Sequence, residues 1–91
     1  MNVDPLVKPI RLSAHARENM RSRGATEREV VEAIRTAPWA RAELGRLECR
    51  KDFAYGQYWN DRFYTTKQVR PIFVDEGHAI VVVTVYVYYF S

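Results

Sequence analysis

The sequence contains one cysteine and no sign of a secretory leader. Because Cys49 is alone, no internal disulfide can form, and the zinc patterns that need several cysteines are excluded. Residues 1–9, M-N-V-D-P-L-V-K-P, lack both the apolar stretch and the cleavage site of a signal peptide. A chain without disulfides favours a reducing compartment. We therefore expect a cytoplasmic protein, with residues 1–9 as an irregular lead-in or a short edge strand.

The common catalytic and cofactor motifs are also missing. The chain has no GxGxxG, no P-loop, no HExxH and no G-x-S-x-G. His15 and His78 with a single cysteine are too few for a zinc site, and Asp75 and Glu76 are neighbours in a predicted turn, which is unsuitable for a paired acid and base. We expect no metal and no cofactor, so any chemistry would come from protein side chains alone.

Formal charge is absent from the last fifteen residues, 77–91. Residues 79–90 read A-I-V-V-V-T-V-Y-V-Y-Y-F, in which β-branched and aromatic side chains favour a strand. The run is well short of the roughly 20 apolar residues that span a bilayer. We predict a long central strand in a soluble sheet and no membrane partner.

Alternation along this strand predicts two different faces. One face would carry the valines and pack under helices: Val81, Val83, Val85 and Val87. The other face would gain hydroxyl groups toward the C-terminus: Ile80, Val82, Thr84, Tyr86 and Tyr88. These hydroxyls either form the floor of a polar site or belong to aromatic packing that reaches water.

Length and charge indicate one small basic domain. Ninety-one residues suffice for a single modest core, so we predict one domain over residues 1–91. The net charge is +3, and the basic excess lies in residues 1–50. Such a distribution suits a partner that carries phosphate groups.

Two helices are predicted in the N-terminal half. Ser13 is a good N-cap for a helix over residues 14–23, and Gly24 can take the left-handed position that ends it. Thr26 and Glu29 form a capping box for a second helix, which Pro38 stops. In the first helix, His15, Asn19 and Arg23 form a polar stripe beside the buried stripe of Leu12, Ala16 and Met20.

Extended structure is predicted after Trp39. Residues 47–53 alternate as a strand, with Lys51 interrupting the inward row; its ammonium group would end either in water or in the site. Residues 54–68 hold five aromatics around a turn at Asn60 and Asp61, and these rings would stack unpaired bases or cover the core. Residues 69–74 read as a strand that Pro71 places at an edge or bulge. Residues 75–78 would turn it into the long strand, antiparallel to it.

These elements predict an α+β fold. Two N-terminal helices would pack on one face of a mainly antiparallel sheet of three to five strands, with the C-terminal strand at its centre.

The remaining polar residues suit RNA cleavage without a metal. In that reaction a base removes the 2′ proton, an acid protonates the leaving 5′ oxygen, and cations stabilise the charge on the phosphorus. Histidine changes its charge in the physiological range, so His15 is the candidate acid or base, although a half-buried histidine is often only a hydrogen-bonding residue. Thr84 and Tyr86 would orient the 2′-OH or the phosphate. The candidate RNA-binding residues are Arg23, Lys51, Lys67 and Arg70.

The sequence resembles a known family over residues 12–90. The run L-S-A-H-A-R-E-N-M-R-S-R-G-A-T-E-R-E-V-V-E-A-I and the later I-V-V-V-T-V-Y are similar to the small bacterial domain family DUF4258. The middle of the chain, with G-R-L-E-C-R-K-D-F and T-K-Q-V-R-P-I-F-V, looks like a subgroup of it. The chain departs from the family at Asn19, where we expect arginine in many relatives.

The resemblance implies a RelE-like fold, related to the RelE/ParE-like toxins and to the barnase-like ribonucleases. It also implies toxin activity on RNA and neutralisation by a small antitoxin protein. We therefore predict a toxin-like, metal-independent endoribonuclease that acts on RNA, free or on the ribosome.

Two alternatives remain. One is a non-catalytic module that binds protein or nucleic acid and uses the end of the long strand to form a homodimer or add a strand. The other is a ParE-like toxin directed at gyrase.

Overall fold

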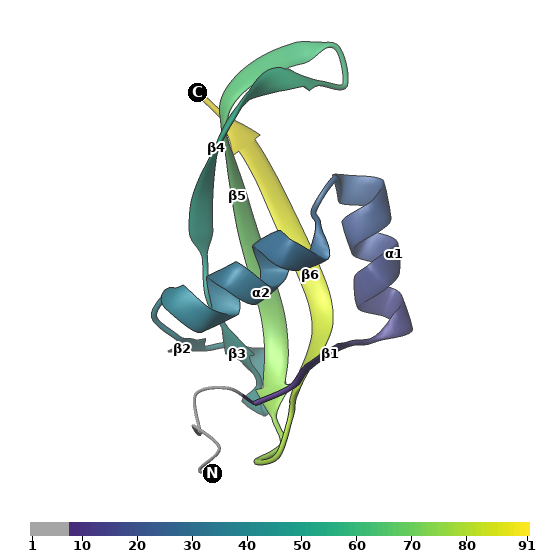
Figure 1. The fold of residues 1–91 in the computed structure, drawn as a ribbon, viewed down its shortest axis with the longest axis vertical. Coiled ribbons are helices and arrows are strands. Elements are labelled where there is room, and N and C mark those ends of the chain that lie inside the picture. The colour runs from purple at the N-terminus through teal and green to yellow at the C-terminus, as the bar shows by residue number, and fades with distance from the viewer. Residues whose placement is uncertain (1–7) are drawn as a thin grey trace, which may run out of the picture.

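The structure is a computed structural model that describes residues 8–91, and this part of the chain folds as α+β (Figure 1). Its two helices are α1 (Ala14–Arg23) and α2 (Glu27–Thr36). Its six strands are β1 (Ile10–Leu12), β2 (Ala40–Arg41), β3 (Leu47–Glu48), β4 (Lys51–Trp59), β5 (Arg62–Asp75) and β6 (Ile80–Phe90). The predicted class is confirmed, and the sheet has more strands than the three to five expected. Residues 1–7 of the predicted lead-in lie outside the described residues.

Both helices begin and end where their local signals predict. The Ser13 side chain accepts a hydrogen bond from the amide of Ala16, and Gly24 adopts the left-handed conformation with φ 84°. Thr26 and Glu29 form the complete capping box. These contacts span only three or four residues, which is why the sequence alone reveals them.

The sheet has the strand order β1-β6-β5-β3-β2, and β4 also pairs with β5. Among the described strands, all neighbours are antiparallel except β1 and β6, which are parallel. The predicted central place of the C-terminal strand is therefore wrong: β5 occupies the middle, because β3 and β4 follow one another along its far side. The predicted antiparallel pairing of the last two long strands is confirmed.

Pro71 lies inside this middle strand and not at an edge. Its pairing partner is Val85, whose amide and carbonyl point away from β5 toward α1. The missing N–H of Pro71 therefore faces the other neighbour, where β3 has ended at Glu48 and β4 begins only at Lys51. A proline is tolerated in the centre of the sheet because it lies opposite this interruption, which also divides the single strand predicted over residues 47–53.

A bulge in β6 changes which side chains face the helices. Ile72 pairs with Thr84 and Phe73 pairs with Val82, so Val83 is an extra residue between the two pairs. Val82 and Val85 consequently face the same side, and the predicted face of four odd-numbered valines is wrong. The buried core cluster contains Ile80, Val82 and Val85 of β6, with Val87 packed against it.

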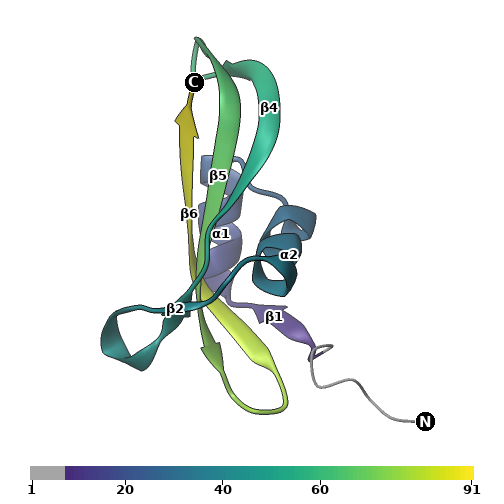
Figure 2. The same cartoon turned by 90° about the vertical axis from the view of Figure 1, so that its left-hand side faces the viewer.

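Both helices lie on one side of the sheet (Figure 2). Ala16 and Met20 of α1 join the same core cluster as Val30, Ala33 and Ile34 of α2. Thr84 and Tyr86, which follow the bulge, are turned to the opposite side. The long, charge-free strand is thus covered on one face and open on the other.

Candidate functional site

A groove lies on the sheet face opposite the core. Its floor is formed by side chains of β5 and β6, and its wall is the segment between β2 and β3, which projects from the sheet on the side away from α2 in Figure 2. The groove has a volume of about 570 Å³. The polar and charged residues that line it are Arg41, Glu43, Arg46, Glu48, Arg70, Thr84 and Tyr86. The structure therefore brings three of the predicted site residues together in one groove: Arg70, Thr84 and Tyr86.

Arg70 and Glu48 form an ion pair in this groove. The Nη2 and Nε atoms of Arg70 donate to the two carboxylate oxygens of Glu48 at 2.7 and 3.2 Å, and Nη1 donates to the Tyr88 hydroxyl at 3.2 Å. These hydrogen bonds lower the pKa of Glu48 and raise that of Arg70, against the opposing effect of burial. Both groups are charged at neutral pH. Arginine has five N–H donors, so two remain for a ligand.

Tyr86 has a guanidinium group on either side of β6. The Cζ atom of Arg70, its cross-strand neighbour on β5, lies 5.3 Å from the ring centroid. The Cζ atom of Arg23, on α1 beyond the other edge of β6, lies 5.2 Å from it. Both distances are within the range of cation–π attraction. Tyr86 as a whole is 39% exposed, and it lines the groove.

Helix α1 takes the place of a neighbouring strand along this edge of β6. The Ser13 hydroxyl donates to the carbonyl of Val83, Asn19 Oδ1 accepts from the amide of Val85, and Arg23 Nη1 donates to the carbonyl of Val85 at 2.7 Å. These bonds satisfy backbone groups that no strand reaches. They also explain Asn19, which is buried and fixes the helix against the bulged strand.

His15 lies in the first turn of α1 and is exposed. It precedes Asn19 by one helical turn on the predicted polar stripe, and Asn19 binds the β6 edge at Val85. Within residues 8–91, no side chain forms a hydrogen bond or ion pair with the His15 imidazole. His15 does not line the groove, although it shares the polar stripe of α1 with Asn19.

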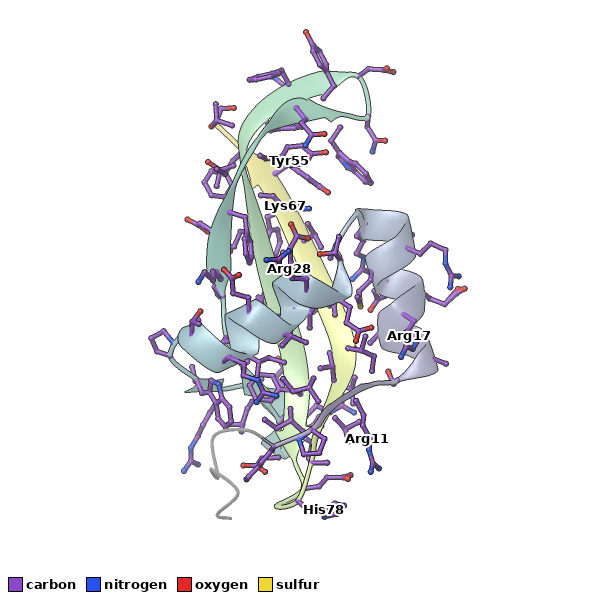
Figure 3. The ribbon with its side chains drawn as sticks, in the orientation of Figure 1. Arg11, Arg17, Arg28, Tyr55, Lys67 and His78 are labelled. Atoms are coloured by element: carbon purple, nitrogen blue, oxygen red, sulfur yellow. The ribbon has the colours of Figure 1, made fainter. Side chains whose placement is uncertain are left out.

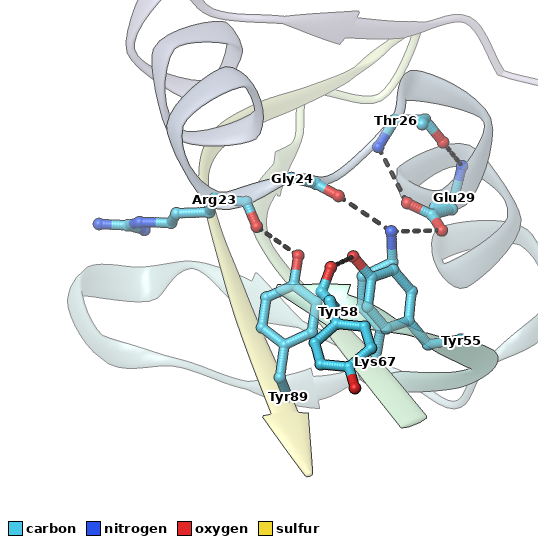
Figure 4. Close-up of polar contacts among 8 residues, drawn as sticks. All are labelled: Arg23, Gly24, Thr26, Glu29, Tyr55, Tyr58, Lys67 and Tyr89. Atoms are coloured by element: carbon cyan, nitrogen blue, oxygen red, sulfur yellow. Dashed lines mark hydrogen bonds and ion pairs between the residues drawn. The ribbon is translucent and has the colours of Figure 1, made fainter. Parts of the chain in front are cut away.

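The two predicted lysines lie on the other face of the sheet. Lys51 Nζ donates to Thr36 Oγ1 at 2.8 Å and lies 3.1 Å from a carboxylate oxygen of Glu32, both on α2. Lys67 is 6% exposed, and its ammonium binds Glu29 Oε2 at 2.8 Å and the Gly24 carbonyl at 2.9 Å (Figures 3 and 4). Neither lysine shares the groove with Thr84 and Tyr86, so a single site that contains all the predicted residues is not formed.

Most of the aromatics predicted in the hairpin pack on Tyr89. The Trp59 ring stacks on Tyr89 with centroids 4.9 Å apart, and Tyr55 and Tyr64 lie at 5.2 and 5.7 Å. The Tyr89 hydroxyl donates to the Arg23 carbonyl at 2.7 Å. Burial raises the pKa of Tyr89 to about 12, with smaller contributions from the nearby Tyr55 and Glu29. These rings pack on one another and beside the turn at Gly24, outside the core cluster and away from the groove lining.

Sequence reasoning missed the groove wall and its carboxylate. Arg41, Arg46 and Glu48 lie in a segment with no regular periodicity, which contains two-residue strands and the turn Glu43–Gly45. One local signal was present: Glu48 alternates with Cys49 in the predicted strand, and so should point away from the core. Its pairing with Arg70, 22 positions later in the chain, depends on the contact between β3 and β5.

Over residues 8–91, no group of three or more histidine, cysteine, aspartate or glutamate side chains is arranged to hold a metal ion. Neither helix in this range is long and apolar enough to cross a bilayer.

Comparison of the chain with protein-family models, with curated proteins and with solved structures finds no match. The resemblance to DUF4258 and to RelE-like toxins therefore stays a prediction.

Proposed function

We propose that this protein binds single-stranded RNA in the β5–β6 groove and cleaves it without a metal ion, as a toxin-type endoribonuclease. The observation that carries the proposal is the position of Tyr86. Its exposed ring lies between Arg23 and Arg70 and beside Thr84 on the floor of an open groove.

This arrangement suits an unpaired nucleotide. An aromatic ring offers a stacking surface for any base, and arginine is the side chain best suited to hold phosphate oxygens through paired N–H donors. Arg41 and Arg46 on the groove wall add positive charge opposite the floor. A duplex would bury its bases against each other, so an unpaired strand is the better ligand for such a site.

The proposed reaction uses the nucleophile that RNA itself supplies. The 2′ oxygen forms a bond to phosphorus while the bond from phosphorus to the 5′ oxygen breaks, which yields a 2′,3′-cyclic phosphate and a 5′-hydroxyl end. The 2′ proton leaves to a base and a proton is delivered to the 5′ oxygen. His15, on the same stripe of α1 as Asn19, is the candidate for one of these transfers. Thr84 would orient the 2′-OH, and Arg23 and Arg70 would stabilise the charge on the phosphorus.

A RelE-like fold and a small antitoxin partner form part of the same proposal. They are supported by the resemblance of the sequence and by the two-helix, mainly antiparallel architecture. A cytoplasmic location fits a toxin that acts on RNA. Fold does not determine function, so the activity has to be tested directly.

The test is incubation of purified protein with RNA in EDTA, both free and on translating ribosomes. We expect cleavage products that end in 2′,3′-cyclic phosphate, and no cleavage at a nucleotide whose 2′-OH is replaced by hydrogen. His15→Ala and Thr84→Val should lower the rate by about 100-fold or more if they act in proton transfer and orientation.

His78→Ala is the matched control. His78 is exposed in the β5–β6 turn and does not line the groove, so its loss should leave the rate unchanged. Intact RNA in every wild-type reaction, with and without ribosomes, would exclude cleavage.

A second candidate is a module that binds RNA or protein without cutting it. Two observations favour it. The Arg70 guanidinium already makes two hydrogen bonds to Glu48 within the groove, and no described side chain forms a hydrogen bond with the His15 imidazole. Tight binding of RNA that stays intact would select this candidate. A gyrase-directed activity, in contrast, would appear in a DNA-supercoiling assay.

A further inference from the structure

Three aromatic side chains form a row along the C-terminal half of β6. Tyr86, Tyr88 and Phe90 alternate along the strand and are 39%, 41% and 41% exposed. Thr84 precedes them on the same face, so the row continues directly from the groove. Their neighbour Tyr89 faces the other side and is packed among the hairpin aromatics. Exposed aromatic rings in such a regular row call for a partner, because a small soluble domain gains nothing from leaving them in water.

The residues beside this row are polar. The cross-strand neighbours on β5 are Arg70 for Tyr86, Gln68 for Tyr88 and Thr66 for Phe90. An interface between apolar protein surfaces would be expected to place aliphatic side chains in these positions. Rings that alternate with hydrogen-bonding and cationic groups instead match the two parts of a nucleotide, its aromatic base and its phosphate.

The spacing of the row matches separated bases. Alternate residues of a strand are about 6.6–6.8 Å apart. Successive bases stacked within one strand of a duplex are only about 3.4 Å apart. A row with twice the stacked spacing therefore cannot follow bases that remain stacked on each other. It can receive bases of an extended strand one at a time, each on its own ring.

We propose that Tyr86, Tyr88 and Phe90 form a stacking platform for three consecutive unpaired nucleotides of an extended RNA strand that runs along β6. This inference rests on the RNA-binding part of the proposed function and assigns a subsite to each base. Arg23 and Arg70 both flank Tyr86, and Arg70 also donates to the Tyr88 hydroxyl, so the phosphate to be cleaved would lie at this end of the row while Tyr88 and Phe90 hold the neighbouring bases.

The experiment measures binding of fluorescein-labelled 2′-O-methyl oligouridylates in EDTA by fluorescence anisotropy. The 2′-O-methyl group prevents cleavage, so binding is measured alone. We expect the affinity to rise steeply from two to four nucleotides and then level off, and a duplex of the same sequence to bind at least tenfold more weakly. Tyr88→Leu and Phe90→Leu should each raise the Kd of a six-nucleotide probe about five- to 100-fold, because leucine keeps the apolar volume but has no π-face.

Tyr58→Leu is the control for a lost aromatic ring. Tyr58 is 71% exposed on the β4–β5 hairpin and contacts Phe63, outside the β6 row. The Kd of the same probe for this variant should therefore differ less than twofold from the wild-type value. Circular dichroism confirms that each variant is folded. An unchanged Kd in both folded β6 variants would overturn the platform, and so would equal affinity for duplex and single strand. A wild-type dimer that disappears in these variants, with no RNA binding, would assign the row to self-association instead.

The two proposals fail in different ways. If unmodified RNA stays intact while the uncleavable probe still binds with the expected sensitivity to Tyr88 and Phe90, the platform stands and the nuclease does not. If RNA is cut but neither the Kd nor the KM responds to these two residues, the nuclease stands and the platform does not. A single-stranded DNA probe of the same length separates recognition of the base from recognition of the ribose.

Discussion

Lys67 and Arg70 lie three residues apart on β5, and each pairs with a glutamate, but they face opposite sides of the sheet. The ammonium group of Lys67 is enclosed by the turn between α1 and α2, where it binds Glu29 and the Gly24 carbonyl and lies 5.2 Å from the Tyr55 ring centroid. The guanidinium of Arg70 binds Glu48 at the floor of an open groove, and its side chain is 23% exposed against 7% for Lys67. The Lys67–Glu29 pair is enclosed within the protein, whereas the Arg70–Glu48 pair is accessible to a ligand in the groove.

The difference lies in what covers each face. Residues on one side of β5 meet the helices, so a charge there must be paired within the protein. Residues on the other side meet a groove whose wall is a short irregular segment. The presence of a basic residue on a strand therefore does not identify a binding residue until the covered face is known. Four predictions test this contrast.

The largest effect is expected from Lys67→Met. Removing the ammonium leaves the Glu29 carboxylate and the Gly24 carbonyl without their partner in a poorly solvated place. We expect the free energy of unfolding to fall by about 3–5 kcal/mol in urea denaturation. Lys51→Met is the matched control: its pair with Glu32 is 31% and 43% exposed, so the loss should stay below about 1 kcal/mol. Equal decreases in the free energy of unfolding of the two variants would contradict the claim that burial makes the Lys67–Glu29 pair important for stability.

Gly24→Ala should destabilise the same side by about 2–4 kcal/mol. A Cβ atom there would lie 2.5 Å from the Tyr89 hydroxyl and 2.8 Å from the Trp59 ring, at a φ of +84°. Gly77→Ala has a similar φ of +89° but meets no atom within 4 Å, so only the conformational cost of about 1–2 kcal/mol remains. Thermal unfolding of both variants measures the difference. If both variants lose the same thermal stability, close packing around Gly24 does not constrain that position.

Arg70→Gln should affect binding more than stability. Glu48 keeps Arg50 at 3.6 Å and borders the groove, so we expect unfolding to become easier by only about 1–2 kcal/mol. RNA affinity should fall about tenfold or more, because the guanidinium beside Tyr86 is lost. Anisotropy titrations and urea denaturation on the same samples measure the two effects. A variant with unchanged affinity would remove Arg70 from the interface.

Tyr89→Phe is expected to have the smallest effect, about 1 kcal/mol at neutral pH, through the lost hydrogen bond to the Arg23 carbonyl. Its pH dependence is more specific. The pKa of Tyr89 is raised to about 12 in the folded protein, above the ordinary value of 10.0. The protonated hydroxyl therefore stabilises the fold fully below pH 10, and this contribution is lost as the pH rises toward 12. Wild type should lose stability over that interval, and the variant should lose less. If the free energy of unfolding of the two proteins changes with pH in the same way, the pKa of Tyr89 is not raised in the folded protein.

The residues of the candidate site were predicted with uneven success. Thr84, Tyr86 and Arg70 meet in the groove because alternation of side chains from residue 84 onward follows the expected period. Arg23, predicted on the polar stripe of the first helix, lies over the Tyr86 ring, a contact that the stripe alone did not indicate. The sequence could not show whether the two lysines face a ligand or pair within the protein. The glutamates that bind them lie on α2, far from them in the sequence. Alternation placed Glu48 away from the core but gave no indication of its pairing with Arg70, and the groove wall gave no periodic signal.

The sequence by itself determined the local features: the ends of both helices, the turn at Asn60 and Asp61, and the strand character of the charge-free C-terminus. Each depends on residues within a few positions of one another. Tertiary structure alone decided the parallel pairing of β1, the middle position of β5 and the bulge at Val83. These features depend on pairing between distant segments, and a shift of one residue moves side chains from one face of the sheet to the other. Which charges are enclosed and which remain accessible is settled only by that pairing.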